Sequence, residues 1–302
     1  MALSTPQRSA EQAVASLNAP RTRSGRERLF AGLLFVATVV SVIVLAVLLV
    51  DIALDGAGRL SLDFLTSYTS RFAERTGIRA GLTGTLSLMV LTAGFAFPVG
   101  VGAAIYLEEF APDNRLTRLL EANISNLAGV PSIVYGLLGA AAFVSVLELG
   151  RSLATGALTL ALLVLPVIIV ASRESIRAVP RAIRDGGLAL GATPLQVVRR
   201  QVLPGALPGI MTGTILALSR AIGEAAPLLV AGAIFSRAAD NVPWRPLDAY
   251  TALPIQIFNF VSRPQEGFKV DAAAAAIIVL MVILLLMNSF AIWLRNRYQR
   301  RW

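Results

Sequence analysis

The chain has 302 residues, of which 56% are hydrophobic and 15% charged, with a mean hydropathy of +0.70 and a net charge of +9. Soluble domains carry about 25% charged residues, so the composition indicates a protein embedded in a membrane. The absence of cysteine and histidine excludes disulfides, thiolate metal sites, Cys nucleophiles and His-based acid–base catalysis.

Six stretches are long and apolar enough to cross a bilayer. They are 29–50, 81–107, 124–147, 152–172, 205–233 and 272–294. The sequence therefore predicts an all-α integral membrane bundle of six transmembrane helices. Segment 1–28 is polar and lacks apolar periodicity, so we expect a disordered tail, followed by a transmembrane domain over 29–302. A cleaved signal peptide is the alternative for the first span, but this polar lead is too long.

The basic residues are distributed unequally between the two sides of the predicted bundle. Seventeen of the 27 lie in 1–28, 108–123, 173–204 and the C-terminal tail from Arg295. Nine lie on the opposite side, in 51–80, at Arg151 and in 234–271. The positive-inside rule then predicts that both termini are cytoplasmic and that 51–80 and 234–271 are extracytoplasmic. The charge is thus a topology signal, and we expect no nucleic-acid binding.

The second to fifth spans each carry an internal proline, namely Pro98, Pro131, Pro166 and Pro227. A proline leaves a helix carbonyl unpaired and kinks the helix, which lipid tolerates only inside a bundle or beside a cavity. Static kinks in a tightly packed bundle would explain one such proline. Four in consecutive spans favour a bundle that lines a path.

The fifth span contains a charge pair, Arg220 and Glu224, four residues apart. This spacing places both on one face of a continuous helix. Pro227 would free the carbonyl of Gly223 between them. Either the two charges neutralise each other and fix helix packing, or they form a polar station on a transport path. An arginine fork suits an oxyanion such as phosphate or sulfate.

The cytoplasmic loop 173–204 contains helix-end signals. Thr193, Pro194 and Gln196 form a capping box with proline at the first helical position, and Gly191 suits the end of a preceding helix. The local prediction is helix, tight turn, helix. The segment is either a solvated connection or a docking element for a cytoplasmic partner.

The same loop resembles the EAA signature of ABC importer permeases. The matching residues are Asp185, Gly191 and the Leu203–Pro204 pair, at the spacing of that signature. Gly186 and Gly187 replace its two alanines, and Gln201 replaces an apolar residue. These departures concern the detailed docking geometry.

Three further stretches are similar to the PstA-type permease subunits of phosphate importers. They are LAGVPSIVYG at 127–136, ALSRAIGEAAPL at 217–228 and TALPIQIF at 251–258. The resemblance covers the chain from about Gly81 to the C-terminal tail. It implies a type I ABC importer permease fold in a bacterial inner membrane and a non-catalytic role.

The resemblance also implies partners and site residues. A PstC-like permease would complete the pathway, two PstB-like subunits would bind ATP and Mg²⁺, and an extracytoplasmic binding protein would deliver phosphate. The chain itself has no P-loop, because its one lysine, Lys269, follows Phe268 and not glycine, and we expect it to bind no cofactor or metal. The substrate-pathway residues would be Arg220, Gly223, Glu224 and Pro227. The ATPase-coupling residues would be Asp185, Gly186, Gly187, Leu188, Gly191, Ala192, Thr193, Pro194 and Leu195.

Two alternatives stay open from the sequence. One is an ABC permease for another oxyanion, sulfate or molybdate. The other is a membrane component of a phosphate-sensing complex, which would need a signalling regulator as partner.

Overall fold

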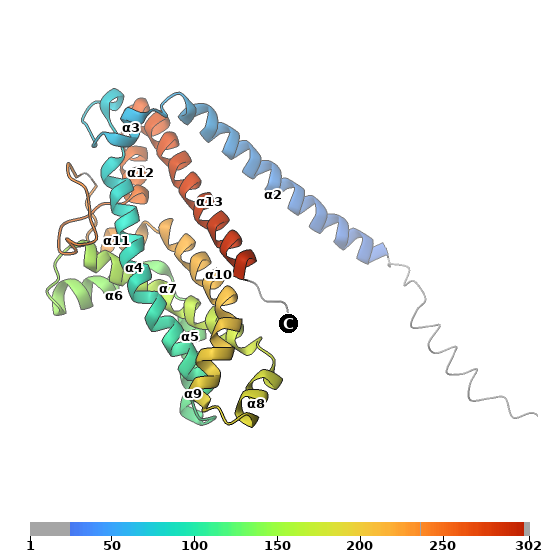
Figure 1. Cartoon of the computed structure of the whole chain (residues 1–302). Coiled ribbons are helices and arrows are strands. Elements are labelled where there is room, and N and C mark those ends of the chain that lie inside the picture. The colour runs from blue at the N-terminus through green and yellow to red at the C-terminus, as the bar shows by residue number, and fades with distance from the viewer. Residues whose placement is uncertain (1–24, 236, 299–302) are drawn as a thin grey trace, which may run out of the picture. The chain divides into compact units, whose positions relative to one another are not determined.

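The computed structural model describes residues 25–235 and 237–298, and within these residues all regular secondary structure is helical. The chain divides into two compact units, Met1–Asp51 and Ile52–Trp302. Figure 1 shows the helices with the labels used below.

The described part of the first unit is one apolar helix. Helix α2(Gly25–Ala57) begins four residues before the predicted span and continues into the second unit. Its two mid-helix hydroxyls are satisfied internally, because Thr38 donates to the Leu34 carbonyl and Ser41 to that of Ala37. No polar side chain between Leu29 and Val50 therefore needs a partner outside the helix. Residues 1–24 of the predicted tail lie outside the described residues.

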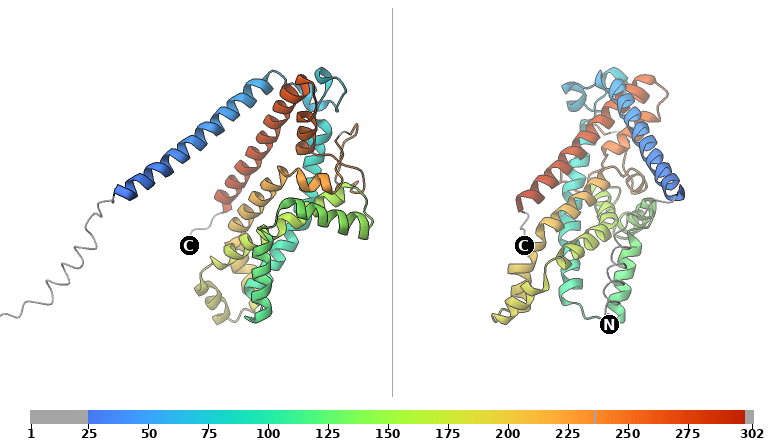
Figure 2. Two further views of the ribbon diagram at one scale, coloured as in Figure 1. Left: turned by 180° about the vertical axis from the view of Figure 1, so that it is seen from behind. Right: turned by 90° about the vertical axis from the view of Figure 1, so that its right-hand side faces the viewer.

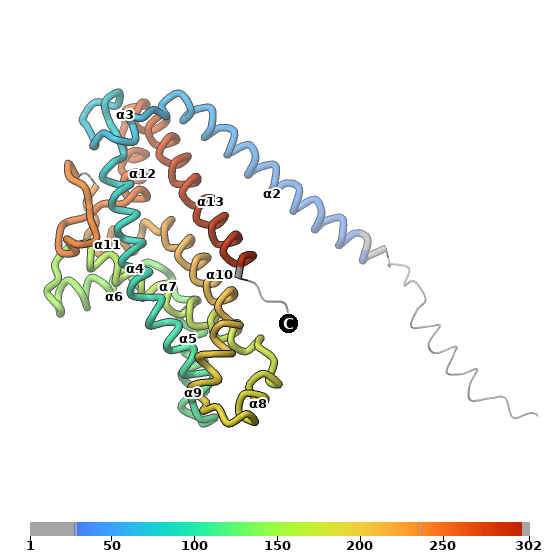
Figure 3. Tube along the Cα trace, viewed as in Figure 1, coloured from blue at the N-terminus to red at the C-terminus, as the bar shows by residue number. Residues whose placement is uncertain are grey.

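Four long helices form the main bundle of the second unit, as Figure 3 shows. They are α4(Arg79–Ile105), α7(Leu153–Arg177), α10(Leu203–Ile222) and α13(Ala273–Tyr298). Helix α7 lies at the centre, and its buried residues join those of α4 and α10 in the largest apolar core. These helices confirm the second, fourth and sixth predicted spans.

The third predicted span, 124–147, is not one straight helix. The structure has α5(Arg115–Leu127), then α6(Ser132–Gly139) and the π-helical segment η3(Ala140–Val146), with a bend of 106° between the two parts. Figure 2 shows this turn clearly. The break follows from Pro131, which caps α6 and disfavours helical backbone in the residue before it. The described residues thus contain five helices that could each span a membrane, or six spans if the bent pair counts as one.

The fifth predicted span, 205–233, is also broken. Helix α10 ends at Ile222, and a separate short helix, α11(Ala226–Val230), follows. Gly223 is the cap residue of α10, and Pro227 lies in the first turn of α11. Proline is favoured in the first turn of a helix, so Pro227 starts a new helix and does not kink an existing one.

Segments 51–80 and 234–271 contain short helices rather than open loops. These are α3(Leu62–Thr66), η1(Ala73–Arg75), α12(Leu253–Val261) and η5(Gly267–Ala272). Phe64, Phe260 and Phe268 are buried together and form a second apolar core. Arg263 covers the Phe268 ring, with its guanidinium carbon 4.3 Å from the ring centre.

At the opposite end of the second unit lie α8(Arg181–Ala189), α9(Pro194–Val197) and the π-helical segments η2(Tyr106–Phe110) and η4(Val198–Val202). The predicted helix, turn and helix are confirmed. Gly191 has φ +80°, and the amides of Gly191 and Ala192 donate to the carbonyls of Leu188 and Gly187. This is a Schellman motif, in which glycine is favoured at the left-handed position. Thr193 and Gln196 form the predicted capping box.

Candidate functional site

The Arg220–Glu224 pair lies at the end of α10. Arg220 is in its last turn, whereas Glu224 follows the cap residue Gly223. The two therefore do not share the face of a continuous helix, contrary to the prediction. Arg220 Nε is 3.7 Å from Glu224 Oε1, and the side chains are 57% and 19% exposed. This distance is an ion pair without a hydrogen bond, so the guanidinium keeps its donors for other partners.

The chain between α10 and α11 leaves the regular helix pattern. The Gly223 and Glu224 amides donate to the carbonyls of Arg220 and Ala221, at 3.2 and 3.1 Å, which closes the end of α10 in a tight turn. Pro227 has no amide hydrogen and begins the next helix. Irregular backbone at membrane depth is tolerated only inside protein or beside a water-filled cavity. The break thus indicates a polar or packed environment around Glu224.

The second proline-containing motif lies against this break. Helix α6 packs on α11, and a Cβ added at Gly136 would lie 2.8 Å from the Pro227 Cα atom. The Tyr135 hydroxyl donates to the Leu127 carbonyl across the α5–α6 bend, at 2.8 Å. Two sequence motifs about ninety residues apart are therefore in contact, and each contains a helix break. Sequence reasoning named both motifs but did not place them together.

The third motif, 251–258, is joined to other elements by hydrogen bonds. The Leu253 amide donates to Thr85 Oγ1 at 2.9 Å, and Gln256 Nε2 donates to Thr69 Oγ1 at 2.8 Å. The preceding Tyr250 is fully buried, and its hydroxyl donates to the Leu228 carbonyl of α11. Burial raises the pKa of this phenol. Tyr250 thus holds α11 in place, a role that its sequence position did not signal.

The predicted coupling residues lie together around α8 and α9. Most are exposed, including the apolar Leu188 and Leu195, and Leu190 between them is the most exposed large hydrophobic residue of the described chain. A set of neighbouring exposed leucines is typical of a protein-interaction surface. The sequence analysis had omitted Leu190.

Gly187 is the buried exception among the coupling residues. A Cβ added there would lie 2.8 Å from Gln201 Oε1 and 2.9 Å from Val197 Cγ2, whereas one added at Gly186 would meet nothing. Gln201 therefore occupies the space that a larger residue at 187 would need. Two of the three departures from the signature, Gly187 and Gln201, are therefore neighbours.

An ion-pair network, which the sequence analysis missed, joins α8, next to and within the predicted coupling segment 185–195, to the bundle. The acids come from η2 and α5, and the arginines come from α7 and α8. Its members are Glu108, Glu109, Glu121, Arg173, Arg177 and Arg184. The pairing of these acids with arginines of 173–204 is a tertiary feature that no local pattern reveals.

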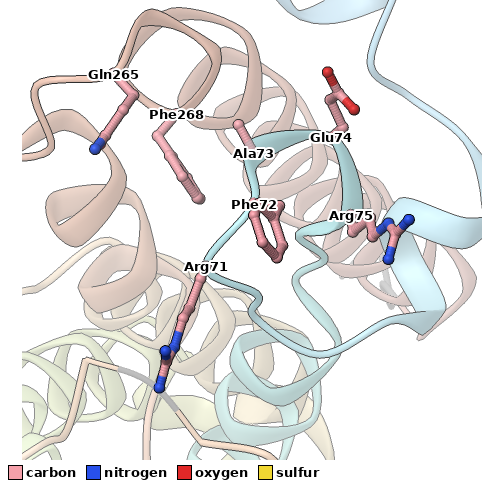
Figure 4. Close-up of a pocket in the computed structure, with 7 residues that line it drawn as sticks. All are labelled: Arg71, Phe72, Ala73, Glu74, Arg75, Gln265 and Phe268. Carbon is pink, nitrogen blue, oxygen red and sulfur yellow. The ribbon is translucent and has the colours of Figure 1, made fainter.

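A separate cavity of about 410 Å³ lies at the end of the unit that holds α3 and α12. It is lined by residues 71–75 together with Gln265 and Phe268. Figure 4 shows that Arg71 and Glu74 point in different directions from this loop. None of the predicted site residues lines it.

A family model described as "Binding-protein-dependent transport system inner membrane component" matches residues 96–302, which is more than half of the chain. The chain belongs to this family. It is a multi-pass membrane permease of the ABC importer family, and the PstA-like resemblance is confirmed by the relatives that follow.

The probable ABC transporter permease protein YqgI of Bacillus subtilis is 32% identical over 244 residues, covering 81% of each chain. The phosphate transport system permease protein PstA of Haemophilus influenzae is 28% identical, covering 80% of this permease and 84% of that one. PstA 1 of Mycobacterium tuberculosis is 38% identical over 154 residues, which is about half of either chain.

Solved structures confirm the fold as that of a type I ABC importer permease. A chain of a bacterial alginate ABC transporter aligns with a TM-score of 0.65 and 16% identity, covering 91% of this permease and 96% of that chain. A chain of the inward-facing MetNI methionine transporter gives 0.61 and 19% identity, with coverage of 74% and 96%. The roles of the individual site residues and the division at residue 28 stay predictions.

Proposed function

We propose that this permease is the PstA-like subunit of an ATP-driven importer of inorganic phosphate. A PstC-like permease would complete the pathway, an extracytoplasmic binding protein would deliver phosphate, and two PstB-like subunits would hold ATP and Mg²⁺. Both termini and the α8–α9 segment would face the cytoplasm. The names of the PstA relatives support the substrate, and the placement of Arg220 supports the mechanism.

The observation that carries the proposal is the exposed guanidinium of Arg220 beside two broken helices. A charged side chain facing lipid at mid-bilayer costs about 2.5–3.5 kcal/mol. Arg220 is more than half exposed and has only a loose ion pair with Glu224. Its environment in the assembled transporter is therefore polar, either water or a partner subunit. Transporters commonly build anion sites where discontinuous helices meet.

The arrangement favours a transient contact with an oxyanion. The guanidinium offers a planar fork of donors that matches two oxygens of phosphate. The carboxylate of Glu224 neutralises part of the positive charge of Arg220. The anion is then bound weakly enough to be released. The α8–α9 leucines would sit on the ATPase, and ATP binding would shift the permease pair between two packings.

The test is phosphate uptake into proteoliposomes that contain the complete complex and its binding protein. We expect Arg220→Gln to lower uptake at least about tenfold, as expected for the loss of one charge-assisted contact. Arg118→Gln is the matched control, because Arg118 is exposed, forms an ion pair with the exposed Asp113 at 3.7 Å and donates to the Asn114 carbonyl of its own turn at 3.5 Å. Unchanged uptake in an assembled Arg220→Gln complex would refute the role of Arg220.

Competition separates the possible substrates. Excess sulfate or molybdate should leave phosphate uptake unchanged if the transporter is selective for phosphate. Transport of sulfate or molybdate in place of phosphate would instead assign the permease to another oxyanion. A complex that transports none of these anions but changes a cytoplasmic regulator on phosphate addition would indicate a sensing component.

A further inference from the structure

One guanidinium connects three helical elements at the cytoplasmic end of the permease. Arg184 lies in α8, and its Nε and Nη2 atoms bind Glu109 Oε1 at 3.1 and 2.6 Å. The same side chain donates to the backbone carbonyls of Val179 at 2.6 Å and Ile176 at 2.9 Å, at the end of α7. Glu109 belongs to η2, which continues α4. Arg184 thus ties α8 to both α4 and α7.

This contact is shielded from water. The side chains of Arg184 and Glu109 are 19% and 10% exposed. A charge-assisted, two-point bond between shielded groups is stronger and more directional than a surface ion pair. The Val179 carbonyl follows the end of α7, where carbonyls have no partner within the helix, whereas the Ile176 carbonyl also accepts from the Val179 amide at 3.2 Å. Loss of either side chain would leave a charge without its partner.

The neighbouring carboxylate makes a parallel contact to α7. Glu108 accepts two hydrogen bonds from Arg177, both at 2.9 Å, and Arg173 lies 3.4 Å from Glu108 and 2.7 Å from Glu121. Consecutive acids of η2 therefore hold arginines of two different helices. The turn that carries them is π-helical, a local geometry that is frequent at functional sites.

Charge neutralisation alone does not account for this geometry. A neutralising partner could come from any exposed arginine, but Arg184 lies on α8, which carries the exposed Leu188 and is followed by the exposed cap residue Leu190. The Arg184 side chain is a direct link from α8 to η2 and to the end of α7, in addition to the chain connection through residues 178–180. A coupling between distant sites needs such a contiguous and directional connection.

We propose that Arg184 and Glu109 are positioning residues that make α8, α4 and α7 move as one body when ATP acts on the coupling segment. The proposal rests on the proposed function as an ATP-driven permease. It adds an internal connection that lies apart from both the ATPase contact and Arg220.

The first test measures the ratio of ATP hydrolysed to anion transported in proteoliposomes. Arg184→Gln and Glu109→Gln should each raise this ratio at least about fivefold, the low end of coupling factors between sites. Arg184→Lys keeps the charge but lacks the fork, so an intermediate ratio is expected. Arg118→Gln, at an exposed ion pair on the same side, should leave the ratio unchanged. A purely structural role would lower hydrolysis and transport together at constant ratio, which would overturn the proposal.

The second test needs no transported substrate. Because the chain has no cysteine, spin labels at Ala189→Cys in α8 and Phe110→Cys in η2 report on these two sites in the assembled complex. The label–label distance should be the same without nucleotide and with trapped ATP. In the Arg184→Gln variant, the distribution of label–label distances should broaden. A nucleotide-dependent distance in the otherwise unchanged chain would refute the proposal. If the complex imports no oxyanion, the proposed function fails while this measurement still decides the role of Arg184.

Discussion

The contact between α6 and α11 allows a substitution whose cost follows from the structure. A Cβ at Gly136 would lie 2.8 Å from Pro227 Cα, 2.9 Å from the Pro227 carbonyl oxygen and 3.0 Å from Val230 Cβ. Normal contacts are about 3.5–4.0 Å, so Gly136→Ala must separate the helices by roughly 0.7 Å or more. Two of the three atoms are backbone and cannot rotate away.

The expected loss of stability is about 1–2 kcal/mol. Overpacking costs about 1–3 kcal/mol, and alanine returns about 0.5–1 kcal/mol because it is the better helix former. A loss of this size lowers the melting temperature by several degrees in a chain of this length. Phosphate uptake should fall as well, because α11 follows directly on Arg220 and Glu224.

The assay is the temperature at which the purified complex loses its size-exclusion peak, together with uptake. Gly94→Ala in α4 is the matched control, since a Cβ there meets nothing within 4 Å, and its melting temperature should be unchanged or slightly higher. The packing argument is wrong if the Gly136→Ala complex has the melting temperature of the wild type. It is also wrong if Gly94→Ala lowers the melting temperature by the same amount.

Three further predictions concern other parts of the chain. Thr193→Ala removes the capping box and should cost about 1 kcal/mol, seen as faster amide exchange over α9, whereas Thr193→Ser should not. Tyr250→Phe should cost only about 1 kcal/mol in thermal unfolding, because the Leu228 carbonyl keeps a second donor, the Ala233 amide. Arg79 donates to the Asp240 carboxylate and holds its pKa below the usual value. That pair therefore stabilises the fold above the ordinary Asp pKa of about 3.9, and the stabilisation is lost as the pH falls below it. Asp240→Asn should be less stable at neutral pH and lose that part of the acid dependence in a pH series of melting temperatures, and an unchanged pH profile would contradict this.

Local signals in the sequence were sufficient for much of the fold. Apolar length located four of the spans as continuous helices, and the capping box at Thr193 and the left-handed Gly191 were identified from residue type alone. These features depend on a few neighbouring residues, so no tertiary information is needed to find them. The family resemblance then added the fold type.

The helix breaks were the main failure of the sequence analysis. Apolar composition cannot distinguish a straight span from two short helices, so 124–147 and 205–233 were taken as continuous. Pro131 and Pro227 were recognised, but a proline can kink a helix or begin one, and the choice depends on packing such as that of Gly136 on Pro227. The Arg184–Glu109 contact joins residues 75 positions apart, and no periodicity predicts such a pair.

The contact between Gly187 and Gln201 limits which pieces of permeases can be exchanged. The signature that this chain resembles has alanine where this chain has Gly187 and an apolar residue where it has Gln201. A graft that replaced only 185–195 would place an alanine methyl against Gln201, whose Oε1 atom is already buried without a hydrogen-bond partner among the described residues. The smallest segment that can be transplanted intact therefore runs from Asp185 to Gln201, and chimaeric importers should be designed with that boundary.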